Sequence, residues 1–151
     1  MKRKTDSQPI LQKNTLPIWE RLEFSQTHLD ECNIDPKYDV PNVSVVLSTF
    51  NRAPHPVETY SNPIGWCLES LTEQRHSGIG EVIVIDDAST DYTGEVVEDY
   101  QSNSNLPIRY IRNKENSGSP ISRNVGIKES KFPLVQFLDD DCVFHPFMTF
   151  G

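Results

Sequence analysis

The chain has 151 residues, of which 36% are hydrophobic, and its formal net charge is −8 at pH 7. This length and apolar content suit one ordinary domain with a single hydrophobic core. The negative charge would repel nucleic-acid phosphates and anionic lipid headgroups, so composition argues against a nucleic-acid partner.

Further features bear on where the protein works. No run approaches the roughly 20 apolar residues that cross a bilayer, and residues 5–9 are polar where a signal peptide needs an apolar stretch. Cys32, Cys67 and Cys142 form no C-x-x-C pair and are expected to be reduced thiols. We therefore expect a cytoplasmic protein with no transmembrane segment in this chain, either free or at a membrane surface.

Residues 1–40 mix charges, prolines and amides, and they contain one weak helical set of apolar residues between positions 18 and 29. We interpret them as an N-terminal extension of unknown role beside a domain that covers residues 41–151. Packing of this extension on the domain is favoured over a partner-binding helix.

Four apolar runs rich in β-branched residues are predicted to be buried strands, at residues 43–48, 81–85, 108–111 and 134–138. Apolar residues at helical spacing, together with start and stop signals, predict helices at residues 64–76, 93–100 and 119–130. Gly78 and Gly80 are expected to end the first helix, and Ser119 to cap the third. Strands that alternate with helices predict an α/β fold of the doubly wound kind, with a mainly parallel sheet and helices on both faces.

Polar clusters follow three of these strands, at residues 48–51, 86–87 and 139–141. In such a sheet these positions share the edge where ligands bind. Each close pair of carboxylates there would repel by on the order of 4 kcal/mol, so a cation is expected among them. In an extended segment Asp139 and Asp141 would face the site together while Asp140 faces elsewhere. A small number of hard oxygen ligands suits Mg²⁺ or Mn²⁺, whose remaining coordination positions are filled by phosphate oxygens and water.

An isolated acidic triplet is more often a solvated turn or helix cap than a ligand set. The acidic pair after a second strand makes a metal–phosphate site the preferred interpretation here. Cations also gather at residues 109–131, where Arg123 is placed to reach a diphosphate, whereas Lys128 and Lys131 are expected on solvated faces. Neither a P-loop nor a G-x-G-x-x-G fingerprint is present, which argues against P-loop NTPases and most dehydrogenases.

Residues 43–146 resemble the family 2 glycosyltransferases of the GT-A fold through five motifs in the expected order. These motifs lie at residues 43–52, 68–74, 81–91, 116–127 and 137–141, and the last stands where the D-x-D motif of that family belongs. Each motif alone would be weak, but five in register are a strong resemblance.

The resemblance implies that the chain binds a nucleotide-diphospho-sugar, with a UDP-sugar expected. The sugar would pass, with inversion, to a hydroxyl of an unidentified saccharide, lipid or protein acceptor. Asp87 would accept a hydrogen bond from the base, and Arg123 would lie near the diphosphate. Asp139 and Asp141 would hold ribose and a Mg²⁺ or Mn²⁺ ion, which would stabilise the leaving group as a Lewis acid. The full implied set of donor-binding residues is Ser48, Thr49, Asn51, Asp87, Gly118, Arg123 and Asp139.

The family's catalytic base and acceptor-binding residues lie well downstream of the D-x-D motif, and this chain ends ten residues after Asp141. We therefore expect a truncated, partial GT-A domain, the donor-binding half, and assign no catalytic residue. A non-catalytic nucleotide-sugar-binding or assembly module is the alternative, so enzyme activity is left open. A nucleotidyltransferase is less favoured, because its glycine- and lysine-rich loop is not seen after the first strand. An apolar surface is expected beside the sheet edge, formed by residues including Phe144, Phe147, Met148 and Phe150.

Overall fold

A computed structural model describes residues 41–55, 62–74 and 78–145. The expected extension and its weak helical set lie outside the described residues, as do Phe147, Met148 and Phe150. In chain order the elements are β1 (Val43–Thr49), α3 (Pro63–Thr72), β2 (Ile79–Asp86), α4 (Thr93–Asn103), β3 (Ile108–Arg112), α5 (Ser119–Glu129) and β4 (Leu134–Leu138). They follow the predicted alternation of strand and helix.

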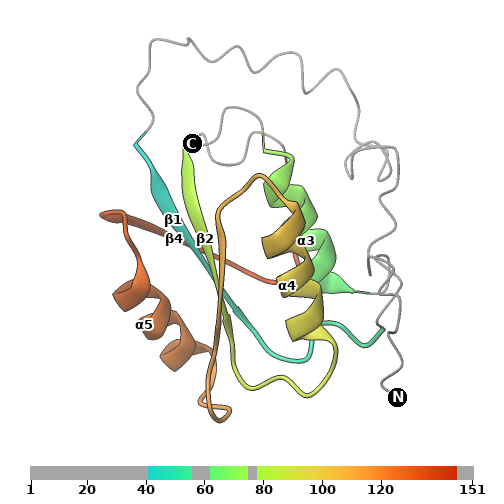
Figure 1. The fold of residues 1–151 in the computed structure, drawn as a ribbon. Helices are drawn as coiled ribbons and strands as arrows, with labels where there is room; N and C mark the ends of the chain where they lie inside the picture. The colour runs from blue at the N-terminus through green and yellow to red at the C-terminus, as the bar shows by residue number, and fades with distance from the viewer. Residues whose placement is uncertain (1–40, 56–61, 75–77, 146–151) are drawn as a thin grey trace, which may run out of the picture.

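The strands form one sheet in the order β3-β2-β1-β4, and each neighbouring pair is parallel. β1 and β2 lie in the middle and are buried along most of their length. A strand covered on both faces needs apolar residues throughout, which explains the continuous apolar runs in the sequence. α3 and α4 pack on one face and α5 on the other (Figure 1). The predicted α/β fold, with a parallel sheet and helices on both faces, is confirmed.

The direction of chain progression across the sheet reverses at β1. From β1 the chain passes through α3 to β2 and through α4 to β3, and α5 then returns it across the other face to β4, beside β1. The connection that leaves β1, through α3, and the connection that leads into β4, through α5, therefore lie on opposite faces of the sheet. In open α/β sheets such a point opens a crevice at the carboxyl ends of the strands, where ligands bind.

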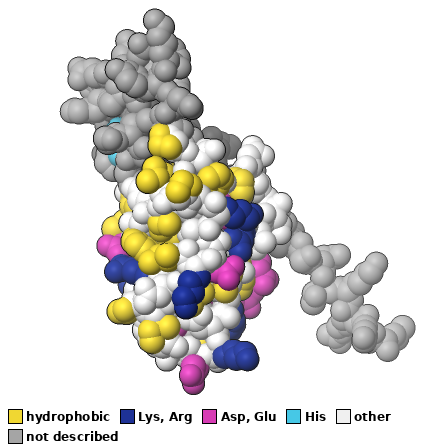
Figure 2. Space-filling model, turned by 90° about the vertical axis from the view of Figure 1, so that its left-hand side faces the viewer, with side chains coloured by type: hydrophobic (Ala, Val, Ile, Leu, Met, Phe, Trp, Pro, Cys, Tyr) yellow, Lys and Arg dark blue, Asp and Glu magenta, His cyan; other side chains and the backbone are white. Residues whose placement is uncertain are grey.

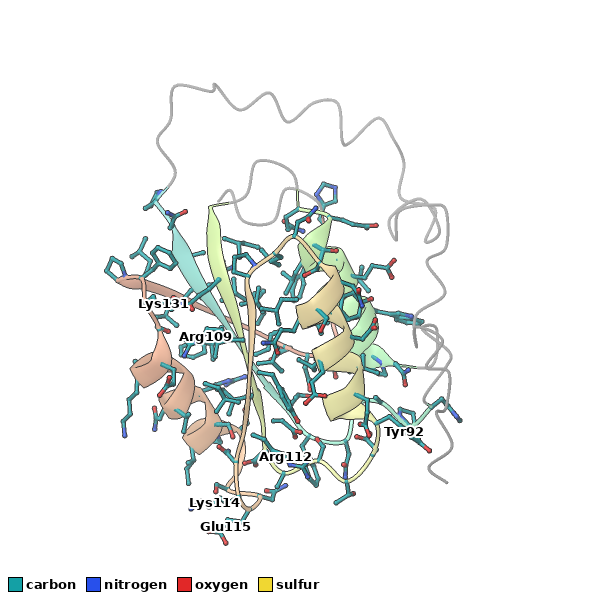
Figure 3. All side chains as sticks on the ribbon, in the orientation of Figure 1. Tyr92, Arg109, Arg112, Lys114, Glu115 and Lys131 are labelled. Carbon is teal, nitrogen blue, oxygen red and sulfur yellow. The ribbon has the colours of Figure 1, made fainter. Side chains whose placement is uncertain are left out.

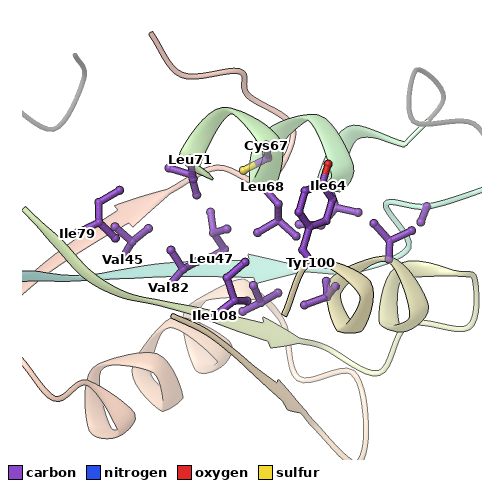
Figure 4. Close-up of a cluster of buried hydrophobic side chains, with 14 residues drawn as sticks. Val45, Leu47, Ile64, Cys67, Leu68, Leu71, Ile79, Val82, Tyr100 and Ile108 are labelled. Atoms are coloured by element: carbon purple, nitrogen blue, oxygen red, sulfur yellow. The ribbon is translucent and has the colours of Figure 1, made fainter. Parts of the chain in front are cut away.

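The larger core lies between the sheet and the helices α3 and α4 (Figure 4). Val45 and Leu47 of β1 belong to it, whereas Val46 belongs to the smaller cluster under α5. This division follows from the alternation of side chains along a strand. The other labelled members of the larger core are Ile64, Cys67, Leu68, Leu71, Ile79, Val82, Tyr100 and Ile108.

A buried carboxylate joins several elements at the amino-terminal end of the sheet. Glu81 is 1% exposed, and it accepts hydrogen bonds from Ser44 Oγ at 2.7 Å, Lys131 N at 2.7 Å and Arg109 Nη1 at 3.2 Å. Burial alone would raise the pKa of Glu81, but these hydrogen bonds and the charge of Arg109 outweigh it and lower the pKa. The ionised side chain therefore ties β1, β2 and β3 to the segment between α5 and β4.

Several boundaries in the first half of the chain differ from the prediction. α3 ends at Thr72, short of residue 76, and Gly80 lies within β2 rather than at a helix end. β2 also continues through Asp86, which was expected in the turn. The backbone of Asp86 stays in the sheet because it pairs with Thr49 on one side and Arg112 on the other.

Helix α5 also starts differently from the prediction. Its N-cap residue is Gly118, with φ at 87°, and Ser119 is the first helical residue. Such a φ suits glycine, which has no Cβ to clash with the backbone. The Ser119 hydroxyl forms a 2.7 Å hydrogen bond with Ser48 Oγ instead of capping the helix.

The segment after β4 packs back onto α3. Phe144 N donates to Ser70 Oγ at 3.1 Å, and Gln74 Nε2 donates to His145 O at 2.9 Å. Phe144 is partly buried against the larger core, so its expected contribution to an exposed surface is wrong. Exposed apolar side chains include Ile121 and Ile127 on α5 and Leu134 and Phe137 on β4. Figure 2 shows hydrophobic side chains on the left-hand side of Figure 1, where α5 lies.

The structure also bears on the cysteines and on membrane crossing. Cys67 is buried, Cys142 is exposed, and both thiols are free; Cys32 lies outside the described residues. Within the described ranges, no helix is long and apolar enough to cross a bilayer.

Candidate functional site

A pocket of about 420 Å³ lies at the carboxyl ends of β1 and β4, beside the start of α5. This is the crevice that the reversal of strand order predicts. Six of the predicted site residues line it: Ser48, Thr49, Asp87, Arg123, Asp139 and Asp141. Four others do so without having been predicted as site residues: Phe50, Arg52, Ser119 and Asp140. Asn51 and Gly118 are not among the lining residues.

The acidic triplet alternates in exposure, although Asp140 and Asp141 lie in a turn rather than in the extended segment that was expected. The side chains of Asp139 and Asp141 are 69% and 46% exposed, whereas that of Asp140 is 9% exposed. Asp140 nevertheless lines the same pocket, so the expectation that it faces elsewhere is wrong. Burial raises the pKa of Asp140, while the positive charge of Arg52 acts in the opposite direction.

Two arginines form ion pairs with the triplet. Arg52 Nε lies 3.3 Å from Asp140 Oδ1, and Arg52 Nη2 lies 3.3 Å from Asp141 Oδ2. Arg123 Nη2 lies 3.3 Å from Asp139 Oδ1, and its guanidinium sits 5.9 Å from the centre of the Phe137 ring. The cation expected among these carboxylates is thus supplied, in this structure, by side chains of the chain itself. Arg52 directly follows residues 48–51, so a basic residue in that loop was the available signal.

Asp87 lies at the pocket wall but is engaged with the loop that precedes α5. Its carboxylate accepts hydrogen bonds from Asn113 Nδ2 at 2.7 Å, from Ser117 N at 3.0 Å and from Gly118 N at 2.6 Å. Burial would raise the pKa of Asp87, but these donors and the Ser122 hydroxyl outweigh it and lower the pKa. An ionised Asp87 therefore holds Gly118 at the start of α5.

Asp86 does not join the acidic cluster. It is fully buried, and its carboxylate accepts hydrogen bonds from Ser89 N at 2.8 Å and from the Tyr110 hydroxyl. Burial, together with the bond to Asp86, raises the pKa of Tyr110 above its usual value. The expectation that both carboxylates after β2 converge on the site is therefore wrong, because adjacent residues of a strand point to opposite sides.

Asn51 anchors the loop after β1 outside the pocket. Its φ of 52° is unusual for a residue other than glycine. Its side-chain Oδ1 accepts a 2.8 Å hydrogen bond from Thr90 N, and its own N–H donates to Ser89 Oγ at 2.9 Å. Asn51 thus joins the loops that follow β1 and β2.

Most of the cations predicted to cluster between residues 109 and 131 lie elsewhere. Figure 3 shows Lys114 at the tip of the loop between β3 and α5. Arg109 and Lys131 lie nearer the amino-terminal end of the sheet, where both bond to Glu81. Arg112 Nη2 donates to Ser89 O at 2.6 Å. Of the arginines and lysines in that segment, Arg123 alone lines the pocket.

Asp139 and Asp141 offer oxygen ligands at an exposed wall of the pocket. The described residues contain no group of three or more His, Cys, Asp or Glu side chains arranged to hold a metal ion. A cation that takes most of its ligands from phosphate and water, as Mg²⁺ does, needs only one or two protein carboxylates. The residues present fit such an ion when an anionic ligand completes its coordination.

Comparison with known proteins shows what the chain is similar to. It is 38% identical, over 104 residues, to an uncharacterized glycosyltransferase of Haemophilus influenzae. It is 32% identical, over 105 residues, to human polypeptide N-acetylgalactosaminyltransferase 13. These alignments cover 69% of this chain in both cases, but only 31% and 18% of the respective relatives. The chain therefore spans less than a third of the length of either protein.

Solved structures show the same fold. TarS 1-349 of S. aureus in complex with UDP matches with a TM-score of 0.58 and 31% identity, over 70% of this chain and 29% of that one. A mannosyltransferase from Pyrobaculum calidifontis in complex with GDP-Man and Mn²⁺ matches with a TM-score of 0.60 and 27% identity, over 73% and 30%. The parallel sheet with its helices is therefore the GT-A arrangement of these glycosyltransferases.

The family profile described as glycosyl transferase family 2 matches residues 44–148. That stretch contains every described helix and strand from Ser44 of β1 through β4, together with all the residues that line the pocket. The chain belongs to glycosyl transferase family 2.

Proposed function

We propose that this chain binds a nucleotide-diphospho-sugar, with a UDP-sugar as the expected donor, in the pocket between β1, β4 and α5. Binding depends on Mg²⁺ or Mn²⁺ and serves transfer, with inversion, to the hydroxyl of an acceptor. The relatives support a nucleotide ligand, since solved neighbours carry UDP, UDP-GlcNAc, or GDP-Man with Mn²⁺.

One observation carries the proposal: exposed carboxylates and arginines share a pocket at the point where strand order reverses. Asp139 and Asp141 lie on one wall, and Arg52 and Arg123 reach into the same space. Binding a diphosphate together with a divalent cation needs both carboxylates and arginines. The carboxylates bind the cation, and the arginines bind the negatively charged phosphate oxygens.

The pocket residues then take distinct roles. Asp139 and Asp141 hold the divalent cation, which when bound supplies Lewis-acid stabilisation of the leaving nucleoside diphosphate. Arg123 contributes a second positive charge near the diphosphate, and Phe137 beneath its guanidinium keeps it oriented. Ser48 and Thr49, at the end of β1, line the nucleotide.

The three remaining predicted residues support the pocket in different ways. The role of Asp87 as an acceptor for the base stays a prediction, and a base N–H would have to share its carboxylate with the donors from Asn113, Ser117 and Gly118. Asn51 and Gly118 support the walls through the loops they fix, Asn51 by its bonds to the loop after β2 and Gly118 as the N-cap residue of α5.

Titration calorimetry of the full chain with UDP and UDP-sugars, with and without Mn²⁺, tests this function. The wild type is expected to bind UDP in Mn²⁺ and to lose affinity when EDTA removes the metal. Asp141→Asn keeps the shape of the side chain but removes its charge, and it is expected to weaken binding in Mn²⁺ by at least about tenfold, or about 1.4 kcal/mol.

Glu98→Gln is the matched control, since it removes one negative charge from an exposed position on α4. It should bind UDP as the wild type does, and circular dichroism should show both variants folded. Equal affinity in Asp141→Asn and wild type, or affinity that is indifferent to EDTA, would refute metal-dependent donor binding through this pocket.

A further inference from the structure

The backbone that carries Arg52 is fixed by hydrogen bonds to the loop after β2. Arg52 N donates to Thr93 Oγ1 at 2.9 Å, and Ala53 N donates to Asp91 Oδ2 at 2.8 Å. Tyr92 N in turn donates to Ala53 O at 3.1 Å. The position of the Arg52 Cα is therefore set by contacts that do not involve its guanidinium.

The side chain of Arg52, by contrast, is 42% exposed and spans two carboxylates. Its Nε and Nη2 atoms reach Asp140 and Asp141, respectively, at 3.3 Å each. Close charge-assisted hydrogen bonds between such groups measure about 2.7–2.9 Å. Longer contacts at a half-exposed position are ones that another cation or anion can displace with little loss of energy.

We propose that Arg52 is an internal counter-cation that competes with the divalent metal for Asp141 and, once displaced, binds the anionic ligand. This inference rests on the proposed metal-dependent donor binding and adds a residue that couples binding of the metal to binding of the nucleotide. Asp141 Oδ2 cannot hold both the guanidinium and the metal at close range, because the two positive charges repel.

Arg52 and Arg123 differ in what holds them when their carboxylates are engaged by a metal. The guanidinium of Arg123 also rests on the Phe137 ring, so it keeps a second support near the pocket. Arg52 also pairs with Asp140, a largely buried residue that lines the pocket. Pivoting about that contact would swing Nη2 away from Asp141 and into the space where a phosphate is expected. Metal and nucleotide should therefore each strengthen the binding of the other.

Titration of Mn²⁺ alone into the full chain tests the competition. Arg52→Gln removes the competing charge and should bind Mn²⁺ about three- to tenfold more tightly than the wild type, as expected for the loss of weak, half-exposed ion pairs. In saturating Mn²⁺, the same variant should bind UDP about threefold or more weakly, because a phosphate contact is lost. Lys114→Gln removes one positive charge at an exposed loop tip and should leave Mn²⁺ affinity within about twofold.

Mn²⁺ affinity in Arg52→Gln that equals or falls below that of the wild type would overturn the proposal. A wild-type chain that binds Mn²⁺ but no nucleotide would instead refute the proposed function, and the Mn²⁺ comparison would still decide the competition.

A second measurement needs no charge-removing variant. The side-chain Nε–H signal of Arg52, assigned by its loss in Arg52→Lys, should shift or broaden when Mg²⁺ is added to the isotope-labelled wild type. The signal of Arg109, which pairs with Glu81 and Glu129 away from the pocket, should stay in place. An Arg52 signal that is as unaffected by Mg²⁺ as that of Arg109 would overturn the competition.

Discussion

Asp87 shows how a buried carboxylate can organise a pocket without pointing freely into it. Three donors from residues 113–118 converge on its two oxygens. Two of those donors are backbone N–H groups, and a backbone N–H that loses its acceptor in a buried place loses about 1–3 kcal/mol of stabilisation. The carboxylate is therefore required in its charged form.

Asp87→Asn should destabilise the fold by about 1–3 kcal/mol, because an amide nitrogen would face the N–H groups of Ser117 or Gly118. Urea unfolding measures this loss, and hydrogen exchange should be faster at the amides of residues 117 and 118. Glu115→Gln, at an exposed position of the same loop, should change stability by no more than about 0.5 kcal/mol. If Asp87→Asn were as stable as Glu115→Gln, Asp87 would not hold this loop.

The same variant has a defined pH dependence. The folded state lowers the pKa of Asp87, so the stability from its charged form is present above the ordinary carboxyl pKa, about 3.9, and is lost as pH falls through the lower folded value. The difference between wild type and Asp87→Asn should therefore be full near neutral pH and shrink below about pH 4. A difference that grows as the pH falls would contradict this assignment.

Among single residues, the sequence indicated the pocket residues better than their partners. Six predicted site residues line the pocket, Asp139 and Asp141 among them. The strand period did not hold at the acidic triplet, because Asp140 lies in a turn and lines the pocket too. That Arg52 would pair with two of these carboxylates could not be predicted, because it depends on how far a side chain from another loop reaches. The inward turn of Asp86 toward Tyr110 was missed for another reason: Asp86 was expected in the turn, whereas it is the last residue of β2.

Among the elements, α5 packs closely on the sheet at Gly126. A Cβ at this position would lie 2.3 Å from Val46 Cγ1, and Val46 is a fully buried, β-branched residue in the middle of the sheet. Because Val46 has little freedom to move, α5 would have to shift outward to admit a methyl group.

Gly126→Ala should destabilise the protein by about 1–3 kcal/mol despite the better helix propensity of alanine. Gly65 in α3 is the matched helical control, since a Cβ there would meet its nearest neighbour at an ordinary 3.6 Å. Gly65→Ala should be neutral or stabilising by up to about 1 kcal/mol. Thermal and urea unfolding followed by circular dichroism compare the two. Equal stability of the two variants would contradict the close packing of α5 on β1.

The elements themselves were largely predictable, because buried parallel strands and amphipathic helices leave strong periodic patterns. Their ends were less so. Gly80 suggests a helix stop in sequence, yet it lies in β2, where a Cβ would overlap the Phe132 ring at 2.2 Å. Glycine is needed at position 80 because of Phe132, which lies 52 positions later in the chain. No local sequence pattern around Gly80 indicates that contact.

For the whole molecule, strand order turns scattered motifs into one site. The prediction that ligands bind at the carboxyl edge did not depend on knowing which strands are neighbours. The structure adds that β4 lies beside β1 rather than beside β3, which brings Arg52 and the acidic triplet to the same pocket. Parallel neighbours far apart in sequence leave no local signature, so this pairing had to come from the structure or from family resemblance.

The proposed donor site is tested most directly by locating Mn²⁺ through its paramagnetic broadening of amide signals in the presence of UDP. The proposed site predicts the strongest broadening at residues 139–141 and 48–52, and little at Glu81 and Glu129, near the amino-terminal end of the sheet. The Asp141→Asn variant should lose most of the broadening at the pocket. Broadening centred on another part of the chain, or unchanged in that variant, would contradict a metal-dependent donor site at the end of β4.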